Sequence, residues 1–409
     1  MKKIFGKFCM GGVFLFSLSM SLTSCEDILG HWEKPTPNPI TPGGGSEGGG
    51  SSTINATAIT LDQTMKVLVK GGDALTITAT ATPAEATLTW ESSDEAVATV
   101  VNGVVTPVGN GITTITAKSG ELSATCEVFV GNEVALSSLA YEAKNYDILK
   151  GDNGANSITI PDGFKVAFDG VKTTEGIVCS GDATIYLTDG STNSVTAPDN
   201  KAGLQIGGTG KTLTINAETA GTGELTAKGG NYAAGIGTGK SSDDNVTGGD
   251  ITINGGVIIA TGGDRAAGIG TGESSGYSSP TSNQCGDITI NGGTVTATGN
   301  NSAAGIGTGR SQDLGKSASQ TCGDITIATG VTSVTAKRDG SGTAILIGTG
   351  SANSGSTQTC GKITFGTAEV YDGTTATGTW TPNPMVADTY GGLNLAISVN
   401  TWTLTPAAP

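Results

Sequence analysis

Acidic residues recur at one position of a repeated phrase in the second half of the chain. Asp250, Asp287 and Asp324 each precede Ile-Thr-Ile at intervals of 37 residues, and Asp182 opens a looser copy. Carboxylates stacked at a fixed spacing repel one another, so backbone N–H groups in Asx turns or a bound calcium ion must offset the repulsion. Asx turns are our first interpretation, because the calcium-binding pattern Gly-Gly-x-Gly-x-Asp is absent. We therefore expect no cofactor, with structural calcium at Asp250, Asp287 and Asp324 as the alternative.

Cysteines form a second recurring set. Cys179, Cys285, Cys322 and Cys360 all stand shortly before the same repeated phrase. Neighbouring repeats bring Cα atoms within the range of a disulfide, but side chains stacked in parallel do not usually meet its torsional needs. A ladder of buried thiols is our interpretation, and a Cys285–Cys322 bridge is the alternative. The CxxC spacing of a zinc site is absent.

Polar segments of varied sequence follow each copy of a third phrase. They are KSSDDNV (240–246), ESSGYSSPTSNQ (273–284), RSQDLGKSASQ (310–320) and SANSGSTQ (351–358). Because they occupy one position in the repeat, we expect loops that stack into a single face, where a repeat protein places its binding residues. The expected contact residues are Asp243, Asp244, Glu273, Tyr277, Arg310 and Asp313. A solvated face without a ligand is the alternative, since only Tyr277 offers a stacking platform.

Catalytic constellations are scarce. Arg265 is the most suggestive single residue, but its counterparts in neighbouring repeats, Tyr232 and Ser302, do not extend it into a catalytic group. The one histidine, His31, lies in a Pro-rich segment. A hydrolase needs two convergent carboxylates, and the sequence does not identify such a pair. We therefore predict that the protein is not an enzyme, with a polysaccharide lyase or glycoside hydrolase as the alternative.

The phrase AAGIGTG recurs at 233–239, 266–272 and 303–309. Glycine-rich phrases bind phosphate when a helix opens after them, but no helical pattern follows any copy. We interpret the glycines as scaffold positions that need a positive φ or lack room for a side chain.

The elements around these residues have a strand period. Ile251 and Ile253 of the first run share a face, Ile258 and Ala260 of the second run do the same, and Ile269 belongs to the third. Three short strands in each repeat of about 37 residues predict a right-handed parallel β-helix over 132–378, with 379–409 as its cap. A β-propeller is the alternative. The fold class is therefore all-β.

Residues 55–131 have a different texture, with short alternating runs divided by turns, as in a β-sandwich. The stretch TATATPAEATLTWESSDEAVATVVNGVVTPVGNGITTITAKSGELSATCEVFV resembles the group 2 bacterial Ig-like domain. The resemblance implies an extracellular spacer or adhesive module without catalysis. We expect Trp90 in its core, near Val97, Val100 and Val105.

The N-terminus has the pattern of an export signal: three lysines, an apolar run and LTSC ending at Cys25. LTSC resembles the lipobox of bacterial lipoproteins, which implies a signal peptide at 1–24 and acylation of Cys25. Glu26 and Asp27 resemble the surface-export signal of Bacteroidetes lipoproteins. Residues 25–54 are rich in Pro, Gly and Ser and predict a flexible tether.

The chain of 409 residues has a formal net charge of −15, which excludes nucleic acid as a partner. Attachment to the membrane is expected through the N-terminal lipid alone. These features predict an outer-membrane lipoprotein, lipid-anchored and exposed at the cell surface. We expect it to act as an adhesin or glycan-binding protein, with extracellular polysaccharide or a host or bacterial surface glycan or protein as its partner.

Overall fold

The structure is a computed structural model that describes residues 54–219, 221–340, 344–371, 388–398 and 400–407. Strands and turns account for these residues, which include no helix. Accordingly, no described segment is a helix long and apolar enough to span a membrane. The predicted signal peptide, Cys25 and nearly all of the tether lie outside the described residues, as does Trp380. The expected all-β class is confirmed.

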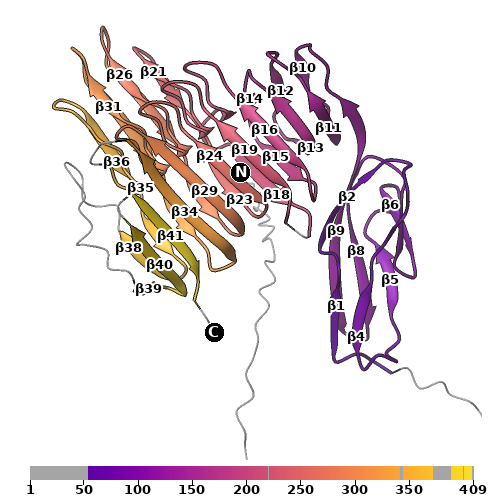
Figure 1. Cartoon of the computed structure of the whole chain (residues 1–409). Coiled ribbons are helices and arrows are strands. Elements are labelled where there is room, and N and C mark those ends of the chain that lie inside the picture. Colours follow the sequence, from indigo (N-terminus) through magenta and orange to yellow (C-terminus); the bar gives the residue numbers. More distant parts are fainter. Residues whose placement is uncertain (1–53, 220, 341–343, 372–387, 399, 408–409) are drawn as a thin grey trace, which may run out of the picture. The chain divides into compact units, whose positions relative to one another are not determined.

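Residues 54–131 form a domain of two packed sheets, which we call the sandwich domain (Figure 1). One sheet has the order β3-β7-β6, the other contains β5, β8, β9 and β2, and β1 pairs with β4. The strands are β1 (Ala58–Leu61), β2 (Met65–Val69), β3 (Leu75–Thr76), β4 (Ala79–Thr82), β5 (Thr89–Ser92), β6 (Ala98–Val101), β7 (Val104–Pro107), β8 (Gly111–Ser119) and β9 (Leu122–Ala135). Trp90, Val97, Val100 and Val105 meet in one apolar cluster between the sheets, as the sequence predicts.

The residues after the sandwich domain form a parallel β-helix (Figure 1). Its first ladder contains β11 (Asp147–Asp152), β13 (Phe164–Thr173), β15 (Ala183–Leu187), β18 (Thr212–Ala217), β23 (Asp250–Ile253), β28 (Ile288–Ile290), β33 (Ile325–Ile327) and β37 (Ile363–Phe365). Its second ladder contains β16 (Thr192–Thr196), β19 (Glu224–Lys228), β24 (Val257–Thr261), β29 (Gly293–Asn300) and β34 (Val331–Asp339). Its third contains β10 (Tyr141–Glu142), β12 (Ile158–Ile160), β14 (Ile177–Cys179), β17 (Leu204–Ile206), β20 (Ile236–Gly237), β25 (Ile269–Gly270), β30 (Ile306–Gly307) and β35 (Ile347–Gly348).

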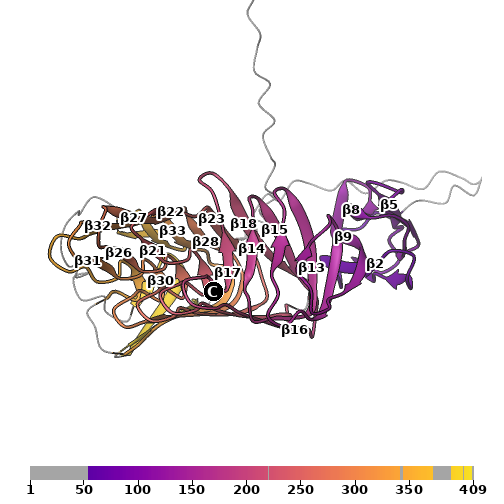
Figure 2. The ribbon, with the colours of Figure 1, turned by 90° about the horizontal axis from the view of Figure 1, so that it is seen from above.

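Much of the polar segments expected to be loops is strand, with short turns between the strands, so the prediction of loops is wrong for the strand residues. A fourth ladder contains β21 (Ser241–Ser242), β26 (Ser274–Gly276) and β31 (Ser311–Asp313). A fifth contains β22 (Asn245–Thr247), β27 (Thr281–Cys285), β32 (Ala318–Cys322) and β36 (Thr357–Cys360). Figure 2 shows β22, β27 and β32 in one row and β21, β26 and β31 in a second. The three coils that begin at β20, β25 and β30 therefore have five strands each, where the sequence predicts three.

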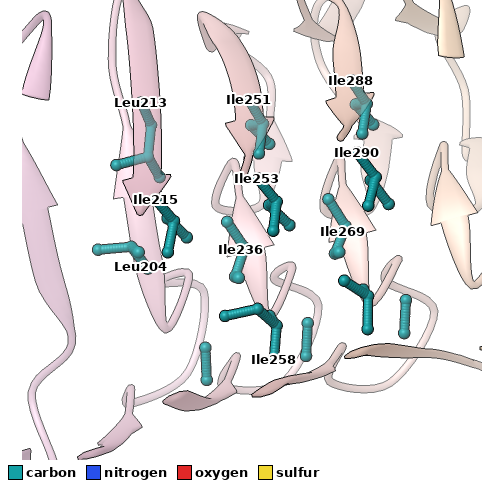
Figure 3. Packing of buried hydrophobic residues seen from close by; sticks show 14 of the residues in the cluster. Leu204, Leu213, Ile215, Ile236, Ile251, Ile253, Ile258, Ile269, Ile288 and Ile290 are labelled. Atoms are coloured by element: carbon teal, nitrogen blue, oxygen red, sulfur yellow. The ribbon is translucent and has the colours of Figure 1, made fainter. Parts of the chain in front are cut away.

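Identical positions of successive coils fill the interior. Ile251 pairs with Ile288, and Ile258 pairs with Val295 in the next ladder, all without solvent exposure. Figure 3 shows side chains of the first, second and third ladders meeting inside the coil, among them Ile253, Ile258 and Ile269. A coil of this kind buries its apolar face only against its neighbours. The predicted registers of the first three ladders are confirmed.

The glycines of the AAGIGTG phrase are confirmed as scaffold. Gly270 has a φ of +131°, and a Cβ atom there would meet the carbonyl oxygen of Gly307 at 1.8 Å. The preceding Ile269 pairs with Ile306 and is fully buried. The phrase therefore supplies one inward side chain and a backbone that contacts the next coil directly.

Polar side chains fill the interior beside the fifth ladder. Asn283 and Gln320 are nearly inaccessible to solvent and accept hydrogen bonds from the hydroxyl groups of Thr238 and Thr271. Gln358 accepts from Thr308 at 2.7 Å in the following coil. These threonines are the sixth residue of each AAGIGTG copy, so the phrase also bonds the polar fifth ladder to the apolar third ladder.

Antiparallel strands end the parallel array. They are β38 (Ala368–Tyr371), β39 (Asp388–Tyr390), β40 (Leu393–Ser398) and β41 (Thr401–Pro406). β41 pairs with β34, and Trp402 opposes Ala336 with only 9% of its surface exposed. Covering the last second-ladder strand in this way removes an open edge.

At the other end, β9 runs through the predicted domain boundary at 131/132. Its first part pairs with β8 and β2 of the sandwich domain, and residues 132–135 pair in parallel with β11. Phe129, Ile148 and Tyr186 pack in one apolar cluster that joins residues of both domains. One continuous strand therefore serves as the last strand of the sandwich domain and the first of the β-helix.

Candidate functional site

Asp243 is the most heavily bonded of the predicted contact residues. Its Oδ1 atom accepts hydrogen bonds from the backbone amides of Tyr277 (2.8 Å), Ser278 (2.8 Å) and Ser279 (3.1 Å). Its Oδ2 atom accepts from the Ser278 hydroxyl at 2.7 Å. The hydroxyl, followed by these amides, holds the pKa of Asp243 well below its usual range. The carboxylate is thus committed to fixing the turn of the next coil.

Asp244 and Asp313 also fix turns. Asp244 Oδ1 accepts from the Ser242 amide, and Asp313 Oδ1 accepts from the Gly315 amide, both at 2.8 Å. Tyr277 leaves 53% of its surface exposed. Of the six predicted contact residues, Glu273 and Arg310 lie close enough for the arginine charge to lower the pKa of the carboxyl group.

Glu273 is a buried carboxylate, where the sequence predicts an exposed loop residue. Only 1% of its surface is accessible, and the residue directly precedes strand β26. Arg265 Nη1 lies 3.2 Å from Glu273 Oε1, and Lys240 Nζ lies 3.7 Å from Oε2. Burial raises the pKa of Glu273, while Arg265, Lys240 and Arg310 act in the opposite direction. Two cations on neighbouring coils thus face a carboxylate that pays a desolvation cost.

An aromatic ring lies under the same two cations. Lys240 Nζ is 4.6 Å from the centroid of the Tyr232 ring, and the Arg265 guanidinium carbon is 5.6 Å from it. Both distances fall within the range of cation–π attraction. Tyr232 is half-buried, so part of its ring faces solvent. Lys240 and Arg265 fix the position of the ring.

Contacts on two sides extend the group. The Gln312 side-chain amide, oriented to match its neighbours, donates to Glu273 Oε1 at 3.0 Å and accepts from Arg310 at 2.8 Å. On the other side, Arg265 Nε lies 3.5 Å from Asp264 Oδ2, and Asn301 donates to Asp264 Oδ1. We call this set the corner cluster; its members are Tyr232, Lys240, Asp264, Arg265, Glu273, Arg310 and Gln312.

The backbone of the third ladder sets the geometry. Tyr232 and Arg265 occupy the turn before the third-ladder strand of successive coils, with φ of 68° and 59°. Glu273 and Arg310 follow that strand, and their amides donate to the carbonyl oxygens of Tyr232 and Arg265, both at 2.8 Å. Each coil therefore places one side chain before the AAGIGTG phrase beside one that follows the phrase in the next coil.

The sequence does not reveal that the Arg265 guanidinium lies over the Tyr232 ring of the preceding coil. Among the residues that the structure describes, Ser302 has the same position in the next coil but is not bonded to the corner cluster. The signal was present in the repeat, because Tyr232 and Arg265 precede the phrase while Lys240, Glu273 and Arg310 follow it. The sequence does not show that the residue before one copy of the phrase lies beside the residue that follows the next copy.

The aspartate column bonds across coils. Asp250 Oδ1 accepts from the amide of Asp287 (2.9 Å), Asp287 from that of Asp324 (2.8 Å), and Asp324 from that of Lys362 (2.7 Å). The amide belongs to the next coil, where the sequence predicts an Asx turn within one coil. Among the residues that the structure describes, no three His, Cys, Asp or Glu side chains are grouped to hold a metal ion.

Two more sets of like residues, asparagines and cysteines, lie in neighbouring coils. Asn254 Nδ2 donates to Asn216 Oδ1 at 2.8 Å, so amide side chains stack between neighbouring coils. Cys285, Cys322 and Cys360 are in register in the fifth ladder as free thiols, with 3.2 Å between the first two sulfur atoms. Cys179 lies in β14 of the third ladder, so its assignment to the same position is wrong.

Comparisons with known families fit this architecture. Residues 55–128 match the bacterial Ig-like domain of group 2, and residues 251–273 and 288–310 match the beta helix repeat. The chain carries a bacterial Ig-like domain and β-helix repeats. Both matches agree with the sheets described above.

Comparisons with whole proteins add little. No curated protein matches the chain. Among solved structures, the crystal structure of domains 4 and 5 of the S-layer protein SbsC is 25% identical, with a TM-score of 0.16. That match covers 18% of this chain and 51% of the other.

Proposed function

We propose that this protein is an outward-facing outer-membrane lipoprotein that binds extracellular glycan without cleaving it. The observation that carries the proposal is the corner cluster, in which the Tyr232 ring and the Lys240 and Arg265 side chains meet at the side of the β-helix. An Ig-like domain with a β-helix fits a surface or carbohydrate-interacting role.

The chemistry of the corner cluster suits a sugar. Aromatic rings pack against the apolar faces of sugar rings, and charged donors bond to hydroxyl or anionic groups more strongly than neutral ones. The backbone hydrogen bonds of the third ladder fix the position of both groups before a ligand arrives. Such preorganisation reduces the entropy lost on binding.

Membrane attachment is proposed through acylation of Cys25, with the tether of residues 25–54 separating the lipid from the folded domains. The LTSC motif and the acidic pair after it support this part of the proposal. A Cys25→Ala variant should appear in the soluble fraction of the producing cells, while the unaltered chain stays with the outer membrane. Protease treatment of intact cells tests exposure, since a chain facing inward would resist digestion.

Binding is tested with the mature chain and a panel of neutral and charged polysaccharides. Tyr232→Ala should weaken binding by about tenfold, equivalent to about 1.4 kcal/mol. Tyr277→Ala is the matched control, because it removes an exposed ring that makes no contact with the corner cluster in the described structure. Equal loss in both variants, or no binding by the unaltered chain, would contradict the proposal.

Polysaccharide cleavage is the second candidate function, and one observation favours it. Asp264 and Glu273 pair with the same guanidinium group, that of Arg265, and burial raises the pKa of Glu273. Two carboxyl groups with different environments are the usual means of general acid–base catalysis on glycans. The test is release of reducing ends or of unsaturated products from the same panel. Release that is lost in Glu273→Gln would show that the protein cleaves polysaccharide.

A further inference from the structure

We infer that the glycan bound at the corner cluster is acidic, carrying sulfate or carboxylate groups, and that it competes with Glu273 for Lys240 and Arg265. The inference rests on the proposed function and assigns its ligand class. It predicts that a proton on Glu273 accompanies the bound ligand.

Charge is the first step. The chain carries 36 acidic and 21 basic residues, so its long-range field repels anions. Within the corner cluster the balance is reversed, because Lys240, Arg265 and Arg310 face only Glu273 and Asp264. Three cations on consecutive coils of an acidic protein mark a place where an anion is favoured locally.

Accessibility is the second step. The Glu273 side chain is 2% exposed, whereas those of Lys240 and Arg265 are 16% and 33% exposed. A ligand approaching from solvent therefore meets the cations before it meets the carboxylate. Lys240 Nζ is 3.7 Å from Glu273 Oε2 and Arg265 Nε is 3.5 Å from Asp264 Oδ2, both longer than a charge-assisted hydrogen bond. An anionic group can approach the same nitrogen atoms at the shorter distance.

The third step concerns protonation. Glu273 faces Arg265, Lys240, Arg310 and Gln312, and Asp264 and Tyr232 stand on the other side of Arg265. With Glu273 ionised the charges of these groups sum to +1, and with Glu273 protonated they sum to +2. Burial raises the pKa of Glu273, so mildly acidic solution shifts this balance before other carboxylates of ordinary pKa are affected. Affinity for an anion should therefore rise as the pH falls from neutral.

The test uses the mature chain and three polymers of one backbone: dextran, dextran sulfate and carboxymethyl-dextran. Dextran sulfate is the main probe, because its sulfate groups stay ionised throughout the titration. We expect dextran sulfate and carboxymethyl-dextran to bind more tightly than dextran by at least about tenfold. Calorimetry in buffers of different ionisation enthalpy should show proton uptake when dextran sulfate binds.

Variants separate the contributions. Arg265→Ala should weaken binding of dextran sulfate by at least about tenfold. Lys118→Ala removes the same charge from the sandwich domain and should leave the affinity unchanged. Glu273→Gln should bind more tightly near neutral pH and lose both the pH dependence and the proton uptake. If Glu273→Gln does not fold, Lys240→Met tests the competition with Glu273 in place.

The outcomes distinguish the two proposals. Equal affinity for the three polymers, or equal effects of Arg265→Ala and Lys118→Ala, overturns the acidic ligand class while glycan binding stands. Binding of dextran sulfate without proton uptake overturns the competition with Glu273. If no polysaccharide of the panel binds at any pH, the proposed function fails together with the inference.

Discussion

The Glu218 carboxylate of the β-helix lies 2.9 Å from Lys66 Nζ of the sandwich domain. Its Oε1 atom accepts from the Val67 amide and its Oε2 atom from the Asp189 amide, both at 2.7 Å. Only 4% of Glu218 is exposed, so these donors satisfy a charge that water does not reach. Strand β9 is shared by both domains, and this carboxylate adds a second connection between them.

Glu218→Ala should therefore loosen the junction. The variant removes the carboxylate that accepts from two half-buried amides, at a cost of up to about 1–3 kcal/mol for each group. Amide hydrogen exchange at Val67 and Asp189 should accelerate strongly, and the urea midpoint should fall. Glu133→Gln is the matched control, because its pair with Lys150 is exposed and is worth about 0–1 kcal/mol. Unchanged exchange at both amides would show that the carboxylate does not hold the junction.

Gly270→Ala tests the direct backbone contact between coils. A methyl group there would meet the Gly307 carbonyl oxygen at 1.8 Å, on a backbone with φ of +131°. Steric and conformational strain should together cost about 3 kcal/mol or more. Gly207→Ala is the control, since its nearest neighbour would be 3.9 Å away and its φ is not in the positive range. Similar melting temperatures for both variants would contradict a role for the phrase as scaffold.

The apolar ladders could be predicted from the sequence because the same residue types recur at a fixed interval. Ile251 and Ile253 alternate with threonine, and an interval of 37 residues brings like residues together, so period and register agree. The same reasoning missed the fourth and fifth ladders, because their inward residues are polar. Asn283 and Gln320 resemble loop residues until Thr238 and Thr271 are seen to bond with them inside the coil.

The corner cluster could not be predicted for a related reason. Some of its contacts join the two residues that flank one third-ladder strand, such as Arg265 and Glu273. Others join neighbouring coils, such as Lys240 with Glu273 and Arg265 with the Tyr232 ring. No periodicity of one residue type signals such a pair. The aspartate column was predicted as a column, but the donor is the amide of the next coil, which only the register of the strands reveals.

Calcium should have no effect on stability if the cross-coil amides alone hold the aspartate column. Asp287 Oδ1 accepts from the Asp324 amide, and Asp287→Ala should cost about 1 kcal/mol through loss of this bond. The melting temperature of the unaltered chain should be the same with calcium and with a chelator. Glu121→Gln in an exposed turn is the control. A rise in melting temperature with calcium that Asp287→Ala abolishes would establish the calcium alternative.

The buried thiols should be inert in the folded protein. Burial raises the pKa of Cys179 to about 12, and the neighbouring thiols of Cys285 and Cys360, with burial, raise that of Cys322. The thiolate is the reactive form, and all four thiols are buried away from reagents in solution. A maleimide at about pH 8 should therefore modify Cys179, Cys285, Cys322 and Cys360 only after unfolding. Mass spectrometry of the alkylated peptides measures this. A cross-linked Cys285–Cys322 peptide would show instead that the first two members of the ladder are joined by a disulfide.

The raised pKa values of Cys179 and Cys322 give stability a pH dependence whose sign is fixed. In the unfolded chain a cysteine titrates at about pH 8.5, below its folded value, so the folded state keeps its proton longer. The stabilisation is fully present below about pH 8.5 and is lost as the pH rises toward the folded pKa of about 12. The urea midpoint should therefore fall between about pH 8 and pH 10, and Cys179→Ala should reduce that fall. A Cys179→Ala variant with the slope of the unaltered chain would show that other groups cause the dependence.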